Sequence, residues 1–299
     1  MGSSKTSSVT VVVLTYGGFG ELERTLCSIT EQTYPIDIVI VSEDASGEIF
    51  PSALRKRFWN AEFRVNQKNL GTVAHMNAMA AQVESDHIKF LAGGDAFSDP
   101  HALESLVTFA ASSTAHVVTS QSMICTSSLH RPLYPFPGKR AKKLEGTGFE
   151  QFRTLACANL ISAPGTLFRR SFFTQLGGFD ESYRLLEDWP AWLRLTREGH
   201  GILYLDRVTC LHSVGGVSSK HLDAHHAPQL KQDMLLCYEK ELLPFLDRFS
   251  QNEVKRLRYG YDVVRGLSHA ELLKKYGWLE RRAVWKRSVK GCLLGLCQN

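Results

Sequence analysis

Short apolar runs alternate with helix-like segments through the first third of the chain. Residues 9–14 form a continuous run of β-branched and aliphatic side chains, which predicts a strand buried on both faces. Similar runs predict further strands at 36–41, 62–65 and 88–91, and segments with one apolar face predict helices at 20–32, 49–58 and 72–84. This β-α-β-α-β-α-β order predicts an α/β fold, with a parallel sheet flanked by helices.

A polar cluster follows three of the predicted strands. Thr15 and Tyr16 follow the first strand, Glu43 and Asp44 the second, and Gly93, Gly94 and Asp95 the fourth. Because ligands bind at the carboxyl ends of parallel strands, we expect these clusters to face one crevice. An aromatic ring suits stacking on a base, and acids suit a ribose or a cation on a diphosphate. Each cluster alone is also typical of an ordinary strand-ending turn, but their repetition favours a nucleotide site.

Composition narrows the class of protein. The 299 residues have ordinary apolar and charged fractions, which indicates a folded chain of one large domain or slightly more. No apolar run is long enough to span a membrane, and the polar N-terminus does not resemble a signal peptide. Seven scattered cysteines without a CxxC pair indicate reduced thiols in a cytosolic protein. The chain lacks GxGxxG, which disfavours a dinucleotide site, and lacks GxxxxGK[ST], which excludes a P-loop.

Taken together, the motifs resemble the family 2 glycosyltransferases of GT-A fold. The segments that carry the resemblance are VVVLTYGGFGELERTLCSITEQTYPIDIVIVSEDAS, NLGTVAHMNAMA, HIKFLAGGDAF, LGGFDESYRLLEDWPAWLRLTREG and GGVSS. They stand in the family's order and cover residues 9–219. The resemblance implies a Rossmann-like, mostly parallel sheet and transfer of a sugar from a nucleoside-diphosphate sugar. The acceptor would be a glycan or lipid-linked hydroxyl, in the synthesis of a polysaccharide such as O-antigen, lipopolysaccharide or capsule.

The same resemblance implies roles for individual residues. The donor would be bound by Thr15, Tyr16, Asp44, Asn69, Gly71, Asn77 and Gly94. Mn²⁺ or Mg²⁺ would be held by Asp95, with His212 as a second ligand, while Glu187 and Trp189 would contact the acceptor. The catalytic base would be Asp188. The chain departs from the family where Gly94 replaces a second acid and where Met76 replaces an arginine, so we expect weak metal binding and one lost donor contact.

Asp188 has two interpretations. It precedes Trp189 and Pro190 at the start of a predicted helix, which is typical of a helix cap. The resemblance instead favours a general base, and a carboxylate fixed at a helix start can serve both purposes. The expected reaction is one displacement at the anomeric carbon, which inverts the configuration. The alternative function is a nucleotide-sugar-binding protein without turnover; a nucleotidyltransferase would need a Gly-rich basic signature that the sequence lacks.

Histidines and a basic segment leave further alternatives open. A strand is predicted at 201–205, and His212 follows this strand and its loop. His212 suits a metal shell, but a packed or surface histidine is an equal interpretation. His221 and His225 have zinc-like i,i+4 spacing without a neighbouring acid or cysteine cluster. The stretch 130–148 is rich in proline and glycine and predicts a loop, which either meets phosphates or is merely solvated. Its cations are Arg131, Lys139, Arg140, Lys142 and Lys143.

The pattern divides the chain into a donor-binding half, 1–115, an acceptor-binding and catalytic half, 116–220, and a helical extension, 221–299. In the extension, 278–296 carries apolar residues including Trp278 on one side and cations on the other. This predicts a helix on an anionic membrane surface, or one packed on the core or on a second subunit of a homo-oligomer. We therefore expect a cytoplasmic protein, either free or peripheral on the membrane. No motif for nucleic acid is present.

Overall fold

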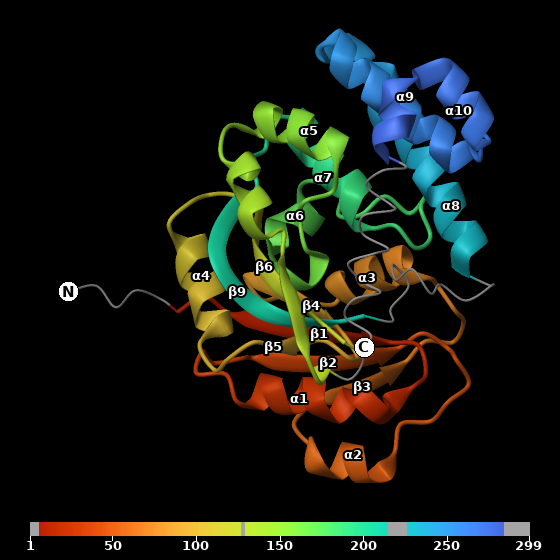
Figure 1. Cartoon of the computed structure of the whole chain (residues 1–299). Coiled ribbons are helices and arrows are strands. Elements are labelled where there is room, and N and C mark those ends of the chain that lie inside the picture. Colours follow the sequence, from red (N-terminus) through yellow and green to blue (C-terminus); the bar gives the residue numbers. More distant parts are fainter. Residues whose placement is uncertain (1–5, 127–128, 215–225, 284–299) are drawn as a thin grey trace. The chain divides into compact units, whose positions relative to one another are not determined.

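The computed structural model describes residues 6–126, 129–214 and 226–283. The chain divides into two compact units, Met1–Leu230 and Lys231–Asn299 (Figure 1). The described strands are β1 (Val9–Thr15), β2 (Ile38–Glu43), β3 (Glu62–Val65), β4 (His87–Ala92), β5 (Ala96–Phe97), β6 (Val117–Cys125), β7 (Pro132–Phe136), β8 (Thr166–Arg169) and β9 (Leu203–Ser213). The α-helices are α1 (Leu22–Thr30), α2 (Ser52–Arg57), α3 (Thr72–Ala80), α4 (Ala102–Ala111), α5 (Gly148–Cys157), α6 (Arg170–Thr174), α7 (Asp188–Arg197), α8 (His226–Cys237), α9 (Gln251–Arg265) and α10 (His269–Tyr276).

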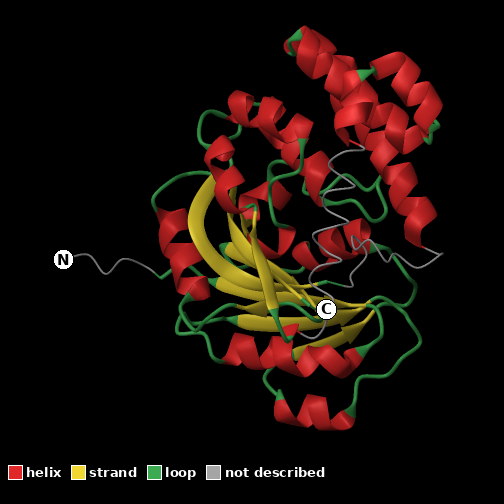
Figure 2. Ribbon diagram, in the orientation of Figure 1, coloured by secondary structure: helices red, strands yellow, loops and turns green. Residues whose placement is uncertain are grey.

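The strands of the first unit form one curled, mostly parallel sheet (Figure 2). Its order is β3-β2-β1-β4-β8-β6-β9-β5, with β7 paired to β6. The four strands from β3 to β4 are parallel, and β6 and β9 are parallel to each other, whereas β8 runs antiparallel to β4 and β6. The α/β fold predicted from the sequence is therefore confirmed. The predicted halves 1–115 and 116–220 share this sheet, and the boundary between them stays a prediction.

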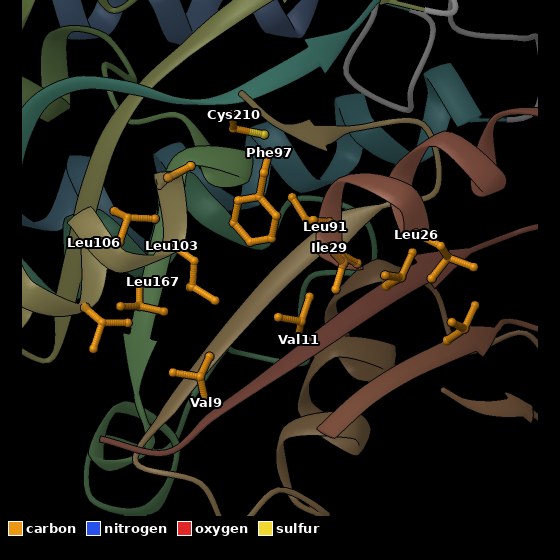
Figure 3. Packing of buried hydrophobic residues seen from close by; sticks show 14 of the residues in the cluster. Val9, Val11, Leu26, Ile29, Leu91, Phe97, Leu103, Leu106, Leu167 and Cys210 are labelled. Carbon is orange, nitrogen blue, oxygen red and sulfur yellow. The ribbon is translucent and has the colours of Figure 1, made fainter. Parts of the chain in front are cut away.

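One face of the sheet packs on α1, α2 and α4. Val9 and Val11 of β1 are fully buried and belong to the same apolar cluster as Leu26 and Ile29 of α1 and Leu103 of α4 (Figure 3). These residues come from the continuous apolar run of β1 and from helix positions three or four apart, as a strand and an amphipathic helix require. Burial on both faces keeps β1 rigid at the centre of the sheet.

An aromatic cluster covers the opposite face and supports α7. The ring of Phe168 in β8 lies 5.2 Å from that of Phe172 in α6 and 5.9 Å from that of Trp192 in α7, centroid to centroid. Gly178, at φ +64°, turns the chain after α6 so that Phe179 joins the cluster, with its ring 5.3 Å from Phe172. The cluster holds the start of α7 in place.

Two sequence predictions about this unit were wrong. The stretch 130–148 is not a loop, because β7 pairs with β6 and the 3-10 segment Gly138–Leu144 buries Ala141 and Leu144. A strand that pairs on one side tolerates the prolines that suggested a loop. The strand predicted at 201–205 instead runs from Leu203 to Ser213, because β9 continues its pairing with β6 through two register shifts.

The second unit is helical, as predicted. Two of its helices begin with a capping box: Ser250 with Glu253 at α9, and Ser268 with Glu271 at α10. The GGVSS motif, His221 and His225 lie outside the described residues, as does most of the segment predicted at 278–296. Across the described parts of the chain, no helix is both long and apolar enough to cross a bilayer.

We expect Phe172→Ala to lower the free energy of unfolding by about 3–5 kcal/mol, because Phe172 is fully buried in the aromatic cluster and its loss leaves a cavity. Phe149→Ala is the matched control, since that ring is 40% exposed and should cost about 1 kcal/mol or less. Urea unfolding followed by tryptophan fluorescence measures both. Equal losses in the two variants would contradict the role assigned to the cluster.

Candidate functional site

The carboxylate of Glu43 holds the loop that carries Tyr16. Glu43, fully buried at the end of β2, accepts hydrogen bonds through Oε1 from the backbone N–H of Gly17 (3.2 Å) and of Ser46 (2.8 Å). Gly17 has φ +63°, and a Cβ there would lie 2.6 Å from Glu48 Oε1, so the close approach requires glycine. The loop thereby presents Tyr16, which is 56% exposed. The sequence marked this acid only as part of a polar cluster.

Asp44 is engaged by the loop that precedes α3. Its Oδ1 accepts from Asn66 Nδ2 (2.8 Å) and from the N–H of Leu70 (2.9 Å), and its Oδ2 accepts from the N–H of Gly71 (2.9 Å). The side chain is buried. A carboxylate has about four acceptor positions, so most of its capacity is already used. The donor contact predicted for Asp44 stays a prediction, and its observed partners fix the 66–71 loop.

Three of the predicted donor residues contact the segment that leads into α7. Arg184 Nη2 donates to Asn69 Oδ1 (2.5 Å), and Gly71, at φ +80°, has no Cβ to meet the Arg184 carbonyl, which would lie 2.8 Å away. Asn77 donates through Nδ2 to the carbonyl of Phe179 (2.8 Å) and accepts from its N–H (3.0 Å). These residues therefore tie α3 to the segment that precedes α7, and their donor contacts stay predictions.

The two predicted metal ligands lie together. Asp95 Oδ1 accepts from Nδ1 of His212 (2.8 Å) and from the N–H of Ser213 (3.1 Å). His212 was predicted to follow a strand and its loop, but it lies inside β9, because that strand extends to Ser213. Burial lowers the pKa of His212, but the hydrogen bond and the charge of Asp95 outweigh burial and hold it above its ordinary value.

A divalent cation fits this pair. Asp95 is 2% exposed, and its Oδ2 is a buried oxygen without a hydrogen-bond partner. A carboxylate oxygen and an imidazole nitrogen are suitable ligands for Mn²⁺, and His212 would bind it through Nε2, because its Nδ1 is hydrogen-bonded to Asp95. Gly94 has φ +154°, which favours glycine where many family members carry a second acid. Within the described residues no group of three His, Cys, Asp or Glu side chains lies where it could hold a metal ion.

Lys89 is a fully buried cation in β4, near Asp95. The apolar run around it in the sequence does not indicate its partners. Its Nζ donates to the carbonyls of Pro164 and Thr166, the latter at 3.2 Å. Burial lowers the pKa of Lys89, and the nearby Asp95 opposes that shift. These hydrogen bonds fasten the 163–165 turn to β4. The same turn is held on its other side by Ser120 Oγ, which donates to the carbonyl of Gly165 (2.9 Å).

Asp188 is the first residue of α7, and Glu187 occupies the cap position without a side-chain cap bond. Asp188 Oδ2 accepts from Asn159 Nδ2 (2.7 Å), and its Oδ1 accepts from the N–H of Trp189 (2.5 Å). Burial raises the pKa of the Asp188 carboxyl above its ordinary value, although these two hydrogen bonds act in the opposite direction. The residue as a whole is half-buried, and its carboxylate is held in place by these hydrogen bonds.

Two residues beside Asp188 have contacts that the sequence did not predict: Asn159 and Trp189. Asn159, at the end of α5, was missed because nothing in the sequence links it to a residue 29 positions later. Trp189 is buried, and its indole Nε1 donates to the carbonyl of Leu155 in α5 (2.9 Å). Its observed contact therefore packs α7 on α5. The acceptor contacts predicted for Glu187 and Trp189 stay predictions.

Comparison with known proteins gives a family match over most of the chain. The model of the family described as "Glycosyltransferase like family 2" matches residues 7–227. An N-acetylglucosaminyl-diphospho-decaprenol L-rhamnosyltransferase of Mycobacterium tuberculosis is 26% identical over an alignment of 255 residues. The match covers 74% of this chain and 82% of the relative.

Solved structures share the fold. The mannosyltransferase PcManGT from Pyrobaculum calidifontis, in complex with GDP-Man and Mn²⁺, superposes with a TM-score of 0.62 at 16% identity, over 98% of this chain and 81% of that one. The 1–349 fragment of S. aureus TarS in complex with UDP gives a TM-score of 0.58 at 15% identity, over 93% and 92% of the chains. At these identities the likeness concerns the fold alone.

Asn159→Ala should raise the pKa of Asp188 further, because it removes a hydrogen bond that favours the ionised carboxylate. The neutral form then persists to higher pH, and any activity that needs the carboxylate loses its acid limb at higher pH. A ¹³C chemical-shift titration of the carboxyl, assigned with Asp188→Asn, measures the change. An unchanged or lowered pKa would show that Asn159 does not stabilise the carboxylate.

Proposed function

The chain belongs to the glycosyltransferase-like family 2, and on this premise we propose that it is an inverting transferase. It is a glycosyltransferase that takes a sugar from a nucleoside-diphosphate sugar. The acceptor in this proposal is a hydroxyl of a lipid-linked glycan. The observation that carries the proposal is the Asp188 carboxyl, which is fixed by Asn159 and raised in pKa by burial.

In the proposed reaction Asp188 accepts the proton of the acceptor hydroxyl as that oxygen attacks the anomeric carbon. Its raised pKa supports this role, because a stronger base is a better proton acceptor, provided that it is ionised at the working pH. Attack from the side opposite the diphosphate in one displacement inverts the anomeric configuration. Asn159 and the N–H of Trp189 hold the carboxylate in place while the proton moves.

The donor in the proposal lies along the carboxyl ends of β1, β2 and β4. Tyr16 stacks on the base, and Glu43 holds the loop that carries Tyr16. Asp44 fixes the neighbouring 66–71 loop. Asp95 and His212 would hold Mn²⁺ or Mg²⁺, and a bound cation would neutralise charge that develops on the leaving diphosphate. Mn²⁺ accompanies GDP-Man in the archaeal structure, and UDP is bound in the TarS fragment.

The acceptor part of the proposal follows the curated relative, whose name specifies a decaprenol diphosphate that carries N-acetylglucosamine. We therefore propose a polyprenyl-diphosphate-linked glycan as acceptor and a step in cell-surface polysaccharide synthesis. The enzyme would then work at the cytoplasmic face of a membrane. A binding protein without turnover is the alternative, and the presence of a positioned base argues against it.

A nucleotide panel with a base variant tests the proposal. UDP, GDP or dTDP with Mn²⁺ should raise the melting temperature, and the matching nucleotide sugar should be hydrolysed or transferred with an inverted product. Asp188→Asn should lose about 10²–10⁴-fold in rate while keeping the melting shift, because it removes only the base. Asp206→Asn, at an exposed acid in β9, is the control and should retain the rate. Full transfer by Asp188→Asn would refute the base, and no melting shift would refute the donor site.

A further inference from the structure

The positive charge of the chain belongs to its second unit. The whole chain has a formal net charge of +5. Residues 1–230 contain 21 Lys and Arg against 22 Asp and Glu, whereas residues 231–299 contain 14 against 8. The catalytic unit is thus close to neutral, and any attraction to an anionic partner through net charge originates in the second unit.

The positively and negatively charged side chains of the second unit differ in burial. In the described part of the second unit, 231–283, every Lys and Arg side chain is exposed: Lys231, Lys240, Arg248, Lys255, Arg256, Arg258, Arg265, Lys274, Lys275, Arg281 and Arg282. Four of its eight acids are buried: Asp233, Glu241, Asp262 and Glu280. The exterior is therefore much more basic than the composition of the unit indicates.

The buried acids are part of the packing between helices. Asp262 of α9 accepts at Oδ2 from Lys275 Nζ (2.6 Å) and from the hydroxyl of Tyr276 (2.6 Å), both in α10. Glu280 accepts from the hydroxyl of Tyr259 (2.5 Å) and pairs with Nδ1 of His269 (2.7 Å). Both carboxylates are held inside the unit, and Asp262 offsets two of the exposed cations, because it pairs with Lys275 (2.6 Å) and Arg265 (3.7 Å).

Most of the remaining acids are also committed locally. Glu253 and Glu271 close the capping boxes of α9 and α10, and Glu239 accepts from the hydroxyl of Tyr261 (2.6 Å). Carboxylates at helix starts are held by the backbone N–H groups there. The cations, by contrast, extend from α8, α9, α10 and the segments between and after them.

An aromatic side chain lies among these cations. Trp278 is 51% exposed, and the guanidinium of Arg282 lies 5.9 Å from the centre of its ring. An exposed tryptophan beside arginine is suited to the boundary between lipid headgroups and acyl chains, where the indole has one apolar and one wet side. Nucleic acid or an acidic protein would use the cations but would not require an exposed indole in this setting.

We propose that the C-terminal basic surface, defined as the exposed cations of residues 231–283 together with Trp278, docks the enzyme on an anionic lipid bilayer. Each Lys or Arg close to such a surface increases affinity on the order of fivefold, so a few of them suffice for reversible binding. The inference rests on the proposed lipid-linked acceptor, because docking brings the enzyme to the surface where the acceptor diphosphate lies. It also extends the sequence prediction, which assigned membrane contact to the segment 278–296.

Vesicle co-sedimentation of the full chain tests the inference. Wild-type protein should bind phosphatidylcholine vesicles with 30% phosphatidylglycerol at least about tenfold more tightly than pure phosphatidylcholine, and 0.5 M NaCl should remove most of this difference. A triple variant on α9, Lys255→Gln, Arg256→Gln and Arg258→Gln, should lose about tenfold or more in affinity. The matched control, Arg55→Gln, Lys56→Gln and Arg57→Gln on α2, should stay within about twofold. Circular dichroism melting confirms that both variants fold.

Three results would overturn the inference: equal binding to neutral and anionic vesicles, equal losses in the two triple variants, or duplex DNA that binds more tightly than the anionic vesicles and displaces them. The nucleotide-induced melting shift, measured on the same samples, separates this inference from the proposed function. A shift without docking refutes the membrane surface alone. Docking without a shift refutes the donor site and leaves the membrane surface supported.

Discussion

The contact of Asp95 with His212 and Ser213 is the constraint on which the site depends. It joins the turn after β4 to the end of β9, two segments more than 110 residues apart in sequence. The contact requires β9 to continue beside β6 as far as Ser213, which the observed register provides. Lys89 of β4 fastens the 163–165 turn to that strand. One buried carboxylate thus gathers elements from both predicted halves of the unit at one edge of the sheet.

A second set of contacts holds the segment that leads to Asp188. Asn77 and the glycine at position 71 hold the segment 179–184, and the aromatic cluster around Phe168 fixes the helix that begins at Asp188. Contacts within the protein therefore hold Asp188 in place at the start of α7. Several residues expected to touch the donor are seen to position neighbouring segments, and a residue can do both only if it has spare donors or acceptors.

The sequence predicted the sheet and the edge that carries the site, because buried strands leave continuous apolar runs and parallel strands align their carboxyl ends. Contacts between side chains far apart in sequence could not be predicted, and Asn159 beside Asp188 is the clearest case. Lys89 was missed because a single cation in an apolar strand gives no sign of its partners. The burial of acids in the second unit could not be predicted either, because composition counts acids such as Glu280 without showing that they are buried.

The central claim is that Asp95 holds a cation against the diphosphate of the donor. Isothermal titration with the nucleoside diphosphate that stabilises the protein, with and without Mn²⁺, tests this most directly. Mn²⁺ should tighten nucleotide binding to the wild type by about tenfold or more, and Asp95→Asn should remove this gain. If the variant folds normally and retains the full Mn²⁺-dependent gain, Asp95 does not hold the cation.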